Sequence, residues 1–78
     1  MINKRIATPL GDVYGSYRGR EYIELSFGVP NKPIEVINVF DYEKGCPVIE
    51  DTDEAVEQAM AEWLSDLDPY NLAIYFKQ

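Results

Sequence analysis

The 78-residue chain contains no histidine and only one cysteine, Cys46. Without histidine, the Ser-His and Cys-His nucleophile pairs are missing, as is the commonest side-chain ligand of metals. One cysteine cannot form an intrachain disulfide, on which small secreted domains usually depend. The five glycines are scattered among turns and form no phosphate-binding loop. We therefore expect a protein that is not an enzyme and that holds no cofactor.

Long apolar runs are also missing. The first residues are not followed by the apolar segment of a secretory signal peptide. No segment approaches the roughly 20 apolar residues that span a bilayer. We therefore expect a cytoplasmic protein, in a bacterial host cell, with no membrane partner. A chain of 78 residues is the length of one compact domain, and 46% hydrophobic residues are enough for one core.

Positive charge is almost absent from the second half of the chain. No lysine, arginine or histidine lies between Gly45 and Phe76. Residues 1–40 carry five bases and four acids, whereas residues 41–78 carry two bases and ten acids, and the net charge is −7 at pH 7. An acidic field of this kind repels nucleic acid and anionic membranes and attracts basic proteins. We therefore expect no direct binding of nucleic acid.

Strand patterns fill the first half of the chain. We predict strands at residues 2–8, 12–18, 21–27 and 34–41. The third is the clearest, because Ile23, Leu25 and Phe27 share one face, as in a half-buried strand. The fourth is apolar on both faces, which predicts a central strand. Glycine and proline predict turns at Arg18-Gly19-Arg20, at residues 28–33 and at residues 43–47.

One amphipathic helix has the strongest pattern in the chain. Its apolar side chains recur at helical spacing: Val56, Ala59, Met60, Trp63, Leu64 and Leu67. Asp51 or Thr52 is placed to cap its start, and Asp68-Pro69 ends it. Residues 71–77 predict a last strand. The order β-β-β-β-α-β indicates the α+β class: a small antiparallel sheet with one amphipathic helix packed on one face, in a single domain of residues 1–78.

Carboxylates flank the apolar stripe of this helix on both sides. Those in the first turn are favoured by the helix dipole. Asp66 and Asp68 lie at the other end, where the dipole disfavours acids. Glu62 and Asp66 form a like-charge pair four residues apart, and no base lies three or four residues from any of these acids. Local rules broken without compensation tend to mark functional sites. We therefore predict a partner-binding surface made of Glu54, Glu57, Glu62, Asp66, Asp68 and Tyr70. The alternative is an ordinary solvated helix face.

Three other features of the sequence are weaker indications of a functional site. Cys46 lacks the electropositive setting that makes a thiolate, which predicts a buried, inert thiol. The acids at residues 50–54 offer oxygen ligands but lack the glycine and the final glutamate of an EF-hand loop, so we expect no metal site. The bases of the first half, which include Arg18 and Arg20, predict a solvated hairpin tip rather than a nucleic-acid site.

In size, acidity and lack of a catalytic set, the chain resembles the small inhibitors made by phages and mobile elements, among them anti-CRISPR proteins and other nucleic-acid mimics. The resemblance implies a stoichiometric inhibitor whose acidic helix occupies the basic nucleic-acid-binding surface of a protein or ribonucleoprotein complex. Two alternatives stay open. One is an immunity protein or antitoxin that neutralises a basic nuclease. The other is a small phage structural or assembly protein, in which the aromatic sheet residues form the interface.

Overall fold

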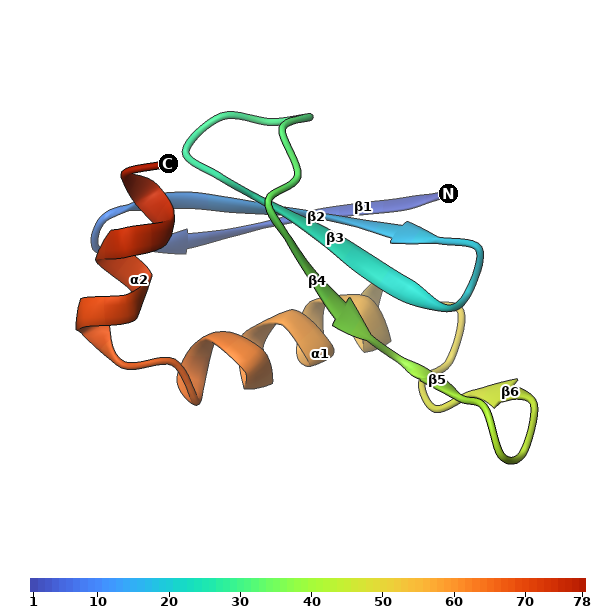
Figure 1. The fold of residues 1–78 in the computed structure, drawn as a ribbon. Helices are drawn as coiled ribbons and strands as arrows, with labels where there is room; N and C mark the ends of the chain where they lie inside the picture. Colours follow the sequence, from blue (N-terminus) through green and yellow to red (C-terminus); the bar gives the residue numbers. More distant parts are fainter.

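The computed structural model describes residues 1–78 and shows a β-sheet layered against helices (Figure 1). The elements are β1 (Ile2–Thr8), β2 (Gly11–Arg18), β3 (Tyr22–Phe27), β4 (Glu35–Asn38), β5 (Phe40–Asp41), β6 (Cys46–Pro47), α1 (Asp53–Ser65) and α2 (Pro69–Phe76). The first four strands form an antiparallel sheet in the order β1-β2-β3-β4, and β5 pairs with β6 in a separate ribbon. The predicted α+β class is confirmed. Neither helix has the length and apolar content needed to cross a membrane.

Side chains alternate across the main sheet, and the face that α1 covers forms the core. β3 places Ile23 and Leu25 on this face, where both are fully buried. α1 adds Val56 and Met60 from its apolar stripe, also fully buried. Gly15 lies beneath α1, where a Cβ atom would collide with the Met60 side chain. Glycine at this position therefore lets the helix approach the sheet closely.

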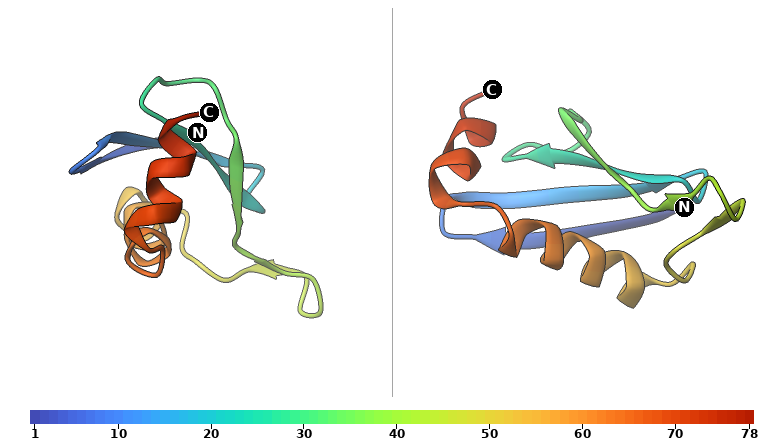
Figure 2. Two further views of the ribbon diagram at one scale, coloured as in Figure 1. Left: turned by 60° about the vertical axis from the view of Figure 1, so that its left-hand side comes forward. Right: turned by 60° about the horizontal axis from the view of Figure 1, so that its bottom comes forward.

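No helix covers the opposite face of the sheet (Figure 2). We call it the outer face, and it carries Asn3, Arg5, Asp12, Tyr14, Ser16, Arg18, Tyr22, Glu24 and Val36. Charges of both signs meet here. Arg18 Nε lies 2.7 Å from Glu24 Oε1, and Arg5 Nη1 lies 3.9 Å from Asp12 Oδ2. The outer face is thus close to neutral.

The last element is a helix, so the prediction of a strand at residues 71–77 is wrong. Asp68 is the N-cap of α2 and Pro69 its first residue, which is a favoured way to begin a helix. The strand pattern put Tyr75 and Phe76 on opposite faces. In the helix both pack against the core. Aromatic packing and the cap therefore override a short apolar alternation.

Phe27, at the end of β3, joins both helices to the sheet. Its ring stacks on Tyr75 with the centroids 4.7 Å apart and meets Phe76 edge-on at 5.5 Å. Trp63 of α1 lies 6.3 Å from Phe27 and 5.7 Å from Tyr75. Each such aromatic pair contributes about 0.5–1.5 kcal/mol beyond the burial of its area. These contacts hold α2 at the end of the sheet near the β1–β2 turn, as Figure 1 shows.

β4 is an edge strand, which corrects the prediction of a central strand at residues 34–41. It pairs only with β3, and Val36 is exposed on its outer side. Ile37 and the buried Val39 pack toward the core. The segment is apolar on both sides because the chain leaves the sheet after Asn38 and continues into β5.

A hydrogen bond ties α2 to β4. The Tyr75 hydroxyl donates to Glu35 Oε2, while Glu35 Oε1 accepts the backbone N–H of Val36 at 3.0 Å. The bond to Glu35 raises the pKa of Tyr75 above the ordinary tyrosine value, and burial and the charge of Glu35 add to the shift. Glu35 thus holds the end of the chain and also satisfies one N–H at the free edge of β4.

Replacing Tyr75 with phenylalanine tests this tie. Tyr75→Phe keeps the aromatic contacts and removes the hydrogen bond, so we expect the free energy of unfolding to fall by about 1–2 kcal/mol near neutral pH. Because the pKa of Tyr75 is raised in the folded protein, this stabilisation is complete below about pH 10, the pKa of an unfolded tyrosine, and is lost as the pH rises through the folded value.

Urea unfolding, followed by the fluorescence of Trp63, measures this difference at each pH. The natural chain and the variant should converge in stability above about pH 10. A gap that stays constant into the alkaline range would contradict the assignment.

Candidate interaction surface

α1 presents its apolar stripe to the sheet and its carboxylates to solvent. The N-cap is Thr52, one of the two residues that the sequence predicted, and its Oγ1 accepts the N–H of Ala55 at 3.2 Å. Asp53 and Glu54 follow in the first turn, where the helix dipole stabilises them. We call the exposed carboxylates of α1 and its flanking residues the acidic face: Glu50, Asp51, Asp53, Glu54, Glu57, Glu62 and Asp66.

Very little positive charge from the chain itself reaches the acidic face. Of the three ion pairs in the structure, one involves this face: Lys4 Nζ lies 3.2 Å from Glu57 Oε1. The Glu57 side chain still keeps 55% of its surface exposed. The other six carboxylates have no cationic partner. The negative potential of this face therefore extends into solvent.

Asp68 has a structural role that the sequence analysis missed. Its Oδ1 accepts the N–H of Asn71 at 2.8 Å, and its Oδ2 accepts the Asn71 side-chain amide at 3.0 Å. Asp68 therefore caps α2, and the argument that it opposes the dipole of α1 without compensation is wrong. The signal was present in the sequence, because an aspartate followed by a proline is also a typical helix start.

The predicted surface divides into two parts. One part lies on α1 and at its end, and consists of Glu54, Glu57, Glu62 and Asp66. Asp66 is the C-cap of α1, and no base lies in the last turn, so this acid remains opposed to the dipole. The second part, Asp68 and Tyr70, lies beyond that end, and Tyr70 is 75% exposed.

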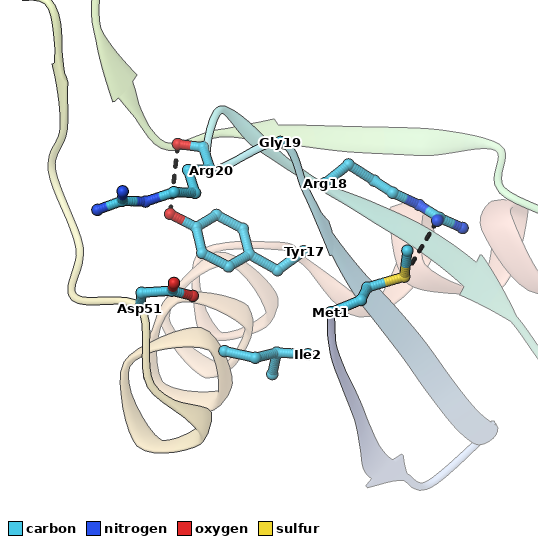
Figure 3. A pocket seen from close by; sticks show the side chains of 7 residues that line it. All are labelled: Met1, Ile2, Tyr17, Arg18, Gly19, Arg20 and Asp51. Atoms are coloured by element: carbon cyan, nitrogen blue, oxygen red, sulfur yellow. Dashed lines mark hydrogen bonds between the residues drawn. The ribbon is translucent and has the colours of Figure 1, made fainter.

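A shallow hollow lies beside the start of the acidic face (Figure 3). Its volume is about 220 Å³, and it is lined by Met1, Ile2, Tyr17, Arg18, Gly19, Arg20 and Asp51. The Tyr17 hydroxyl points to the turn and donates to the Arg20 carbonyl at 3.3 Å. Burial, and then the charge of Asp51, raise the pKa of Tyr17, although Arg20 opposes the shift. Asp51 connects the hollow to the acidic face.

Cys46 is exposed, so the prediction of a buried thiol is wrong. It lies on β6, in a hairpin of residues 39–48 that extends away from the sheet and the helices. The hairpin also exposes Tyr42 and Val48. Sequence periodicity does not identify these exposed residues of the hairpin, because β5 and β6 have only two residues each. No group of three His, Cys, Asp or Glu side chains is arranged to hold a metal ion.

Alanine substitutions separate the roles of Asp66 and Asp68. Asp68→Ala removes the cap of α2, and we expect it to lower the free energy of unfolding by about 1 kcal/mol. Asp66→Ala removes an acid from the unfavourable end of α1, so stability should stay unchanged or rise by about 0.3–1 kcal/mol. Urea unfolding of both variants gives the comparison. Equal losses would show that Asp66 also has a capping role.

The chain matches no protein family model, no curated protein and no solved structure. The acidic face and the exposed hairpin are the two surface features that set this molecule apart from an evenly charged, polar surface.

Proposed function

We propose that the protein is a stoichiometric inhibitor that binds the basic nucleic-acid-binding surface of another protein or ribonucleoprotein complex, as phage anti-CRISPR proteins of the nucleic-acid-mimic type do. The observation that carries the proposal is the acidic face, with six carboxylates that have no cationic partner. The inhibitor acts by occupancy and not by catalysis. Its setting is the cytoplasm of a bacterial host cell.

The length of α1 suits a row of phosphate-binding side chains. Its 13 residues extend about 20 Å at 1.5 Å per residue. A DNA strand presents a phosphate about every 3.4 Å, so a groove that grips this length holds about six phosphates. Glu54, Glu62 and Asp66 can form charge-assisted hydrogen bonds with the same arginine and lysine side chains. The acidic face would then compete directly with nucleic acid.

α1 holds these carboxylates on a rigid frame. Val56 and Met60 are fully buried beneath the helix, and Trp63 contacts Phe27. Binding therefore orders only the carboxylate side chains and leaves the backbone as it is. This limits the entropy lost on association and supports recognition by preformed shape.

The distribution of charge supports a role in recognition beyond solubility. On the outer face, Arg18 is paired with Glu24 and Arg5 with Asp12. Soluble surfaces commonly mix the two signs in this way. The helix layer instead carries acids alone from Glu50 to Asp68. A one-sided field of this kind accelerates encounter with a basic partner and falls with ionic strength.

Reversing two charges on α1 tests the proposal. The tagged protein is incubated with the heparin-retained fraction of a nuclease-treated bacterial lysate at about 50 and about 200 mM salt. We expect it to retain a basic nucleic-acid-binding protein that duplex DNA or RNA displaces. Glu62→Lys/Asp66→Lys should reduce retention at least about tenfold, because it turns attraction into repulsion. The charge-matched control, Asp12→Lys/Glu21→Lys, lies off the acidic face and should retain the protein.

The result that would overturn the proposal is equal retention by the two double variants, or retention that excess nucleic acid does not affect. The nature of the retained protein separates the alternatives. A nuclease toxin would identify an immunity protein or antitoxin, while self-association without any retained protein would favour the structural or assembly role.

A further inference from the structure

A two-stranded hairpin extends from the end of the molecule opposite α2 (Figures 1 and 2). β5 continues onward from β4, and β6 returns toward the start of α1. The base of the hairpin is fixed, because Val39 is buried in the core and its carbonyl accepts the N–H of Val48 at 3.0 Å. Ile49 also packs against the core. The hairpin is therefore firmly attached at its base and free at its tip.

The tip is organised by its own hydrogen bonds. Asp41 Oδ1 accepts the N–H groups of Glu43 and Lys44 at 3.0 and 3.1 Å. The Asp41 carbonyl accepts the N–H of Gly45 at 2.7 Å. Gly45 has a φ of 71°, in the left-handed region that favours glycine. A tip that is ordered in this way loses little conformational entropy when it binds a partner.

Apolar side chains are exposed on this hairpin. Tyr42 is 67% exposed and Val48 is 63% exposed. The Tyr42 ring contacts Phe40, with the centroids 4.9 Å apart, and Phe40 is paired opposite Pro47. Aromatic surface that lies outside the core, on a preformed projection, is typical of a contact with another molecule.

The charges around these apolar side chains select the partner. The hairpin and the segment after it carry four acids, Asp41, Glu43, Glu50 and Asp51, and one base, Lys44. Nucleic acid and anionic membranes are repelled by such a surface. A second copy of this chain would bring two acidic hairpins together and is also disfavoured. The complementary surface is a protein that combines an apolar recess with a basic rim.

We propose that the hairpin is the apolar anchor of the inhibited complex. Tyr42, whose ring packs against Phe40, enters an apolar recess of the partner protein, and lysine or arginine side chains at its rim contact Glu43 and Glu50. The proposal rests on the proposed function in one respect, because the partner is the same basic protein whose groove α1 occupies. The acidic face governs the rate of association, and the hairpin governs the rate of dissociation.

Cys46 provides the handle for a test, because it is the only cysteine, is exposed and lies on the hairpin. A benzophenone maleimide attached to Cys46 is photo-cross-linked in the heparin-retained fraction of a nuclease-treated bacterial lysate. The natural chain is compared with Tyr42→Ala and with Leu10→Ala as the control. Leu10 is 52% exposed in the turn between β1 and β2, which lies at the other end of the molecule from the hairpin (Figure 1).

We expect one basic protein to be cross-linked, at apolar residues next to lysine or arginine. The yield should fall at least about tenfold in Tyr42→Ala, as for the loss of a central anchor, and stay unchanged in Leu10→Ala. Tyr42→Phe keeps the ring and should restore the yield. Equal yields from the two alanine variants, cross-linking of the chain to itself, or no product at all would overturn the proposal.

The Glu62→Lys/Asp66→Lys variant, labelled at Cys46, separates this proposal from the proposed function. In one outcome, the cross-linking yield falls with Tyr42→Ala but stays unchanged with the double reversal and with excess duplex DNA. That result would support the hairpin anchor and contradict nucleic-acid mimicry. If the yield falls with the double reversal but not with Tyr42→Ala, the mimicry stands and the hairpin anchor fails.

Discussion

The position of both helices depends on the ring of Phe27. It ends β3 with one face stacked on Tyr75, an edge-on contact with Phe76, and Trp63 within 6.3 Å. These contacts close the end of the core that lies between α1 and α2. In a chain of this size the free energy of unfolding is only a few kcal/mol. The contacts of Phe27, which join three elements, therefore determine whether both helices stay packed against the sheet. The bond from Tyr75 to Glu35 then ties the end of the chain to β4.

The surface follows from this packing. Because the apolar side of α1 packs against the core, the carboxylates on its other side face solvent along the whole helix. Lys4, at the edge of the sheet, reaches only Glu57. The two arginines of the outer face that form ion pairs are held there by Asp12 and Glu24 and do not neutralise the helix layer. The helix layer is thus acidic while the outer face is close to neutral, and the hairpin and α2 lie at opposite ends of the molecule (Figure 1).

The elements that the sequence predicted well are those with long periodicity or strong local signals. α1 contains five of the six apolar residues that recur at helical spacing, and Thr52 caps it. At the Arg18-Gly19-Arg20 turn, the N–H of Glu21 donates to the Arg18 carbonyl at 3.0 Å, and Gly19 is left-handed. The strand prediction for residues 71–77 failed because seven residues fit either period, and packing against Phe27 decided between them.

Part of the candidate surface was also predictable, because it lies on the helix with the longest periodic pattern. The helical spacing places Glu54, Glu57 and Glu62 beside the apolar stripe of α1, and all three are exposed in the structure. The pairing of Glu57 with Lys4 depends on how β1 packs against α1 and has no local signal. The exposure of Cys46 arises from two-residue strands, which are too short to show a pattern.

The central claim is that the acidic face is a free surface for arginine-rich partners. Titration of the ¹⁵N-labelled protein with an arginine-rich peptide, followed by two-dimensional NMR, tests it most directly. Our account predicts salt-sensitive shifts confined to the acidic face and the adjoining hairpin, which Glu62→Lys/Asp66→Lys weakens. Shifts that spread evenly over both layers, or that centre on the outer face, would contradict it.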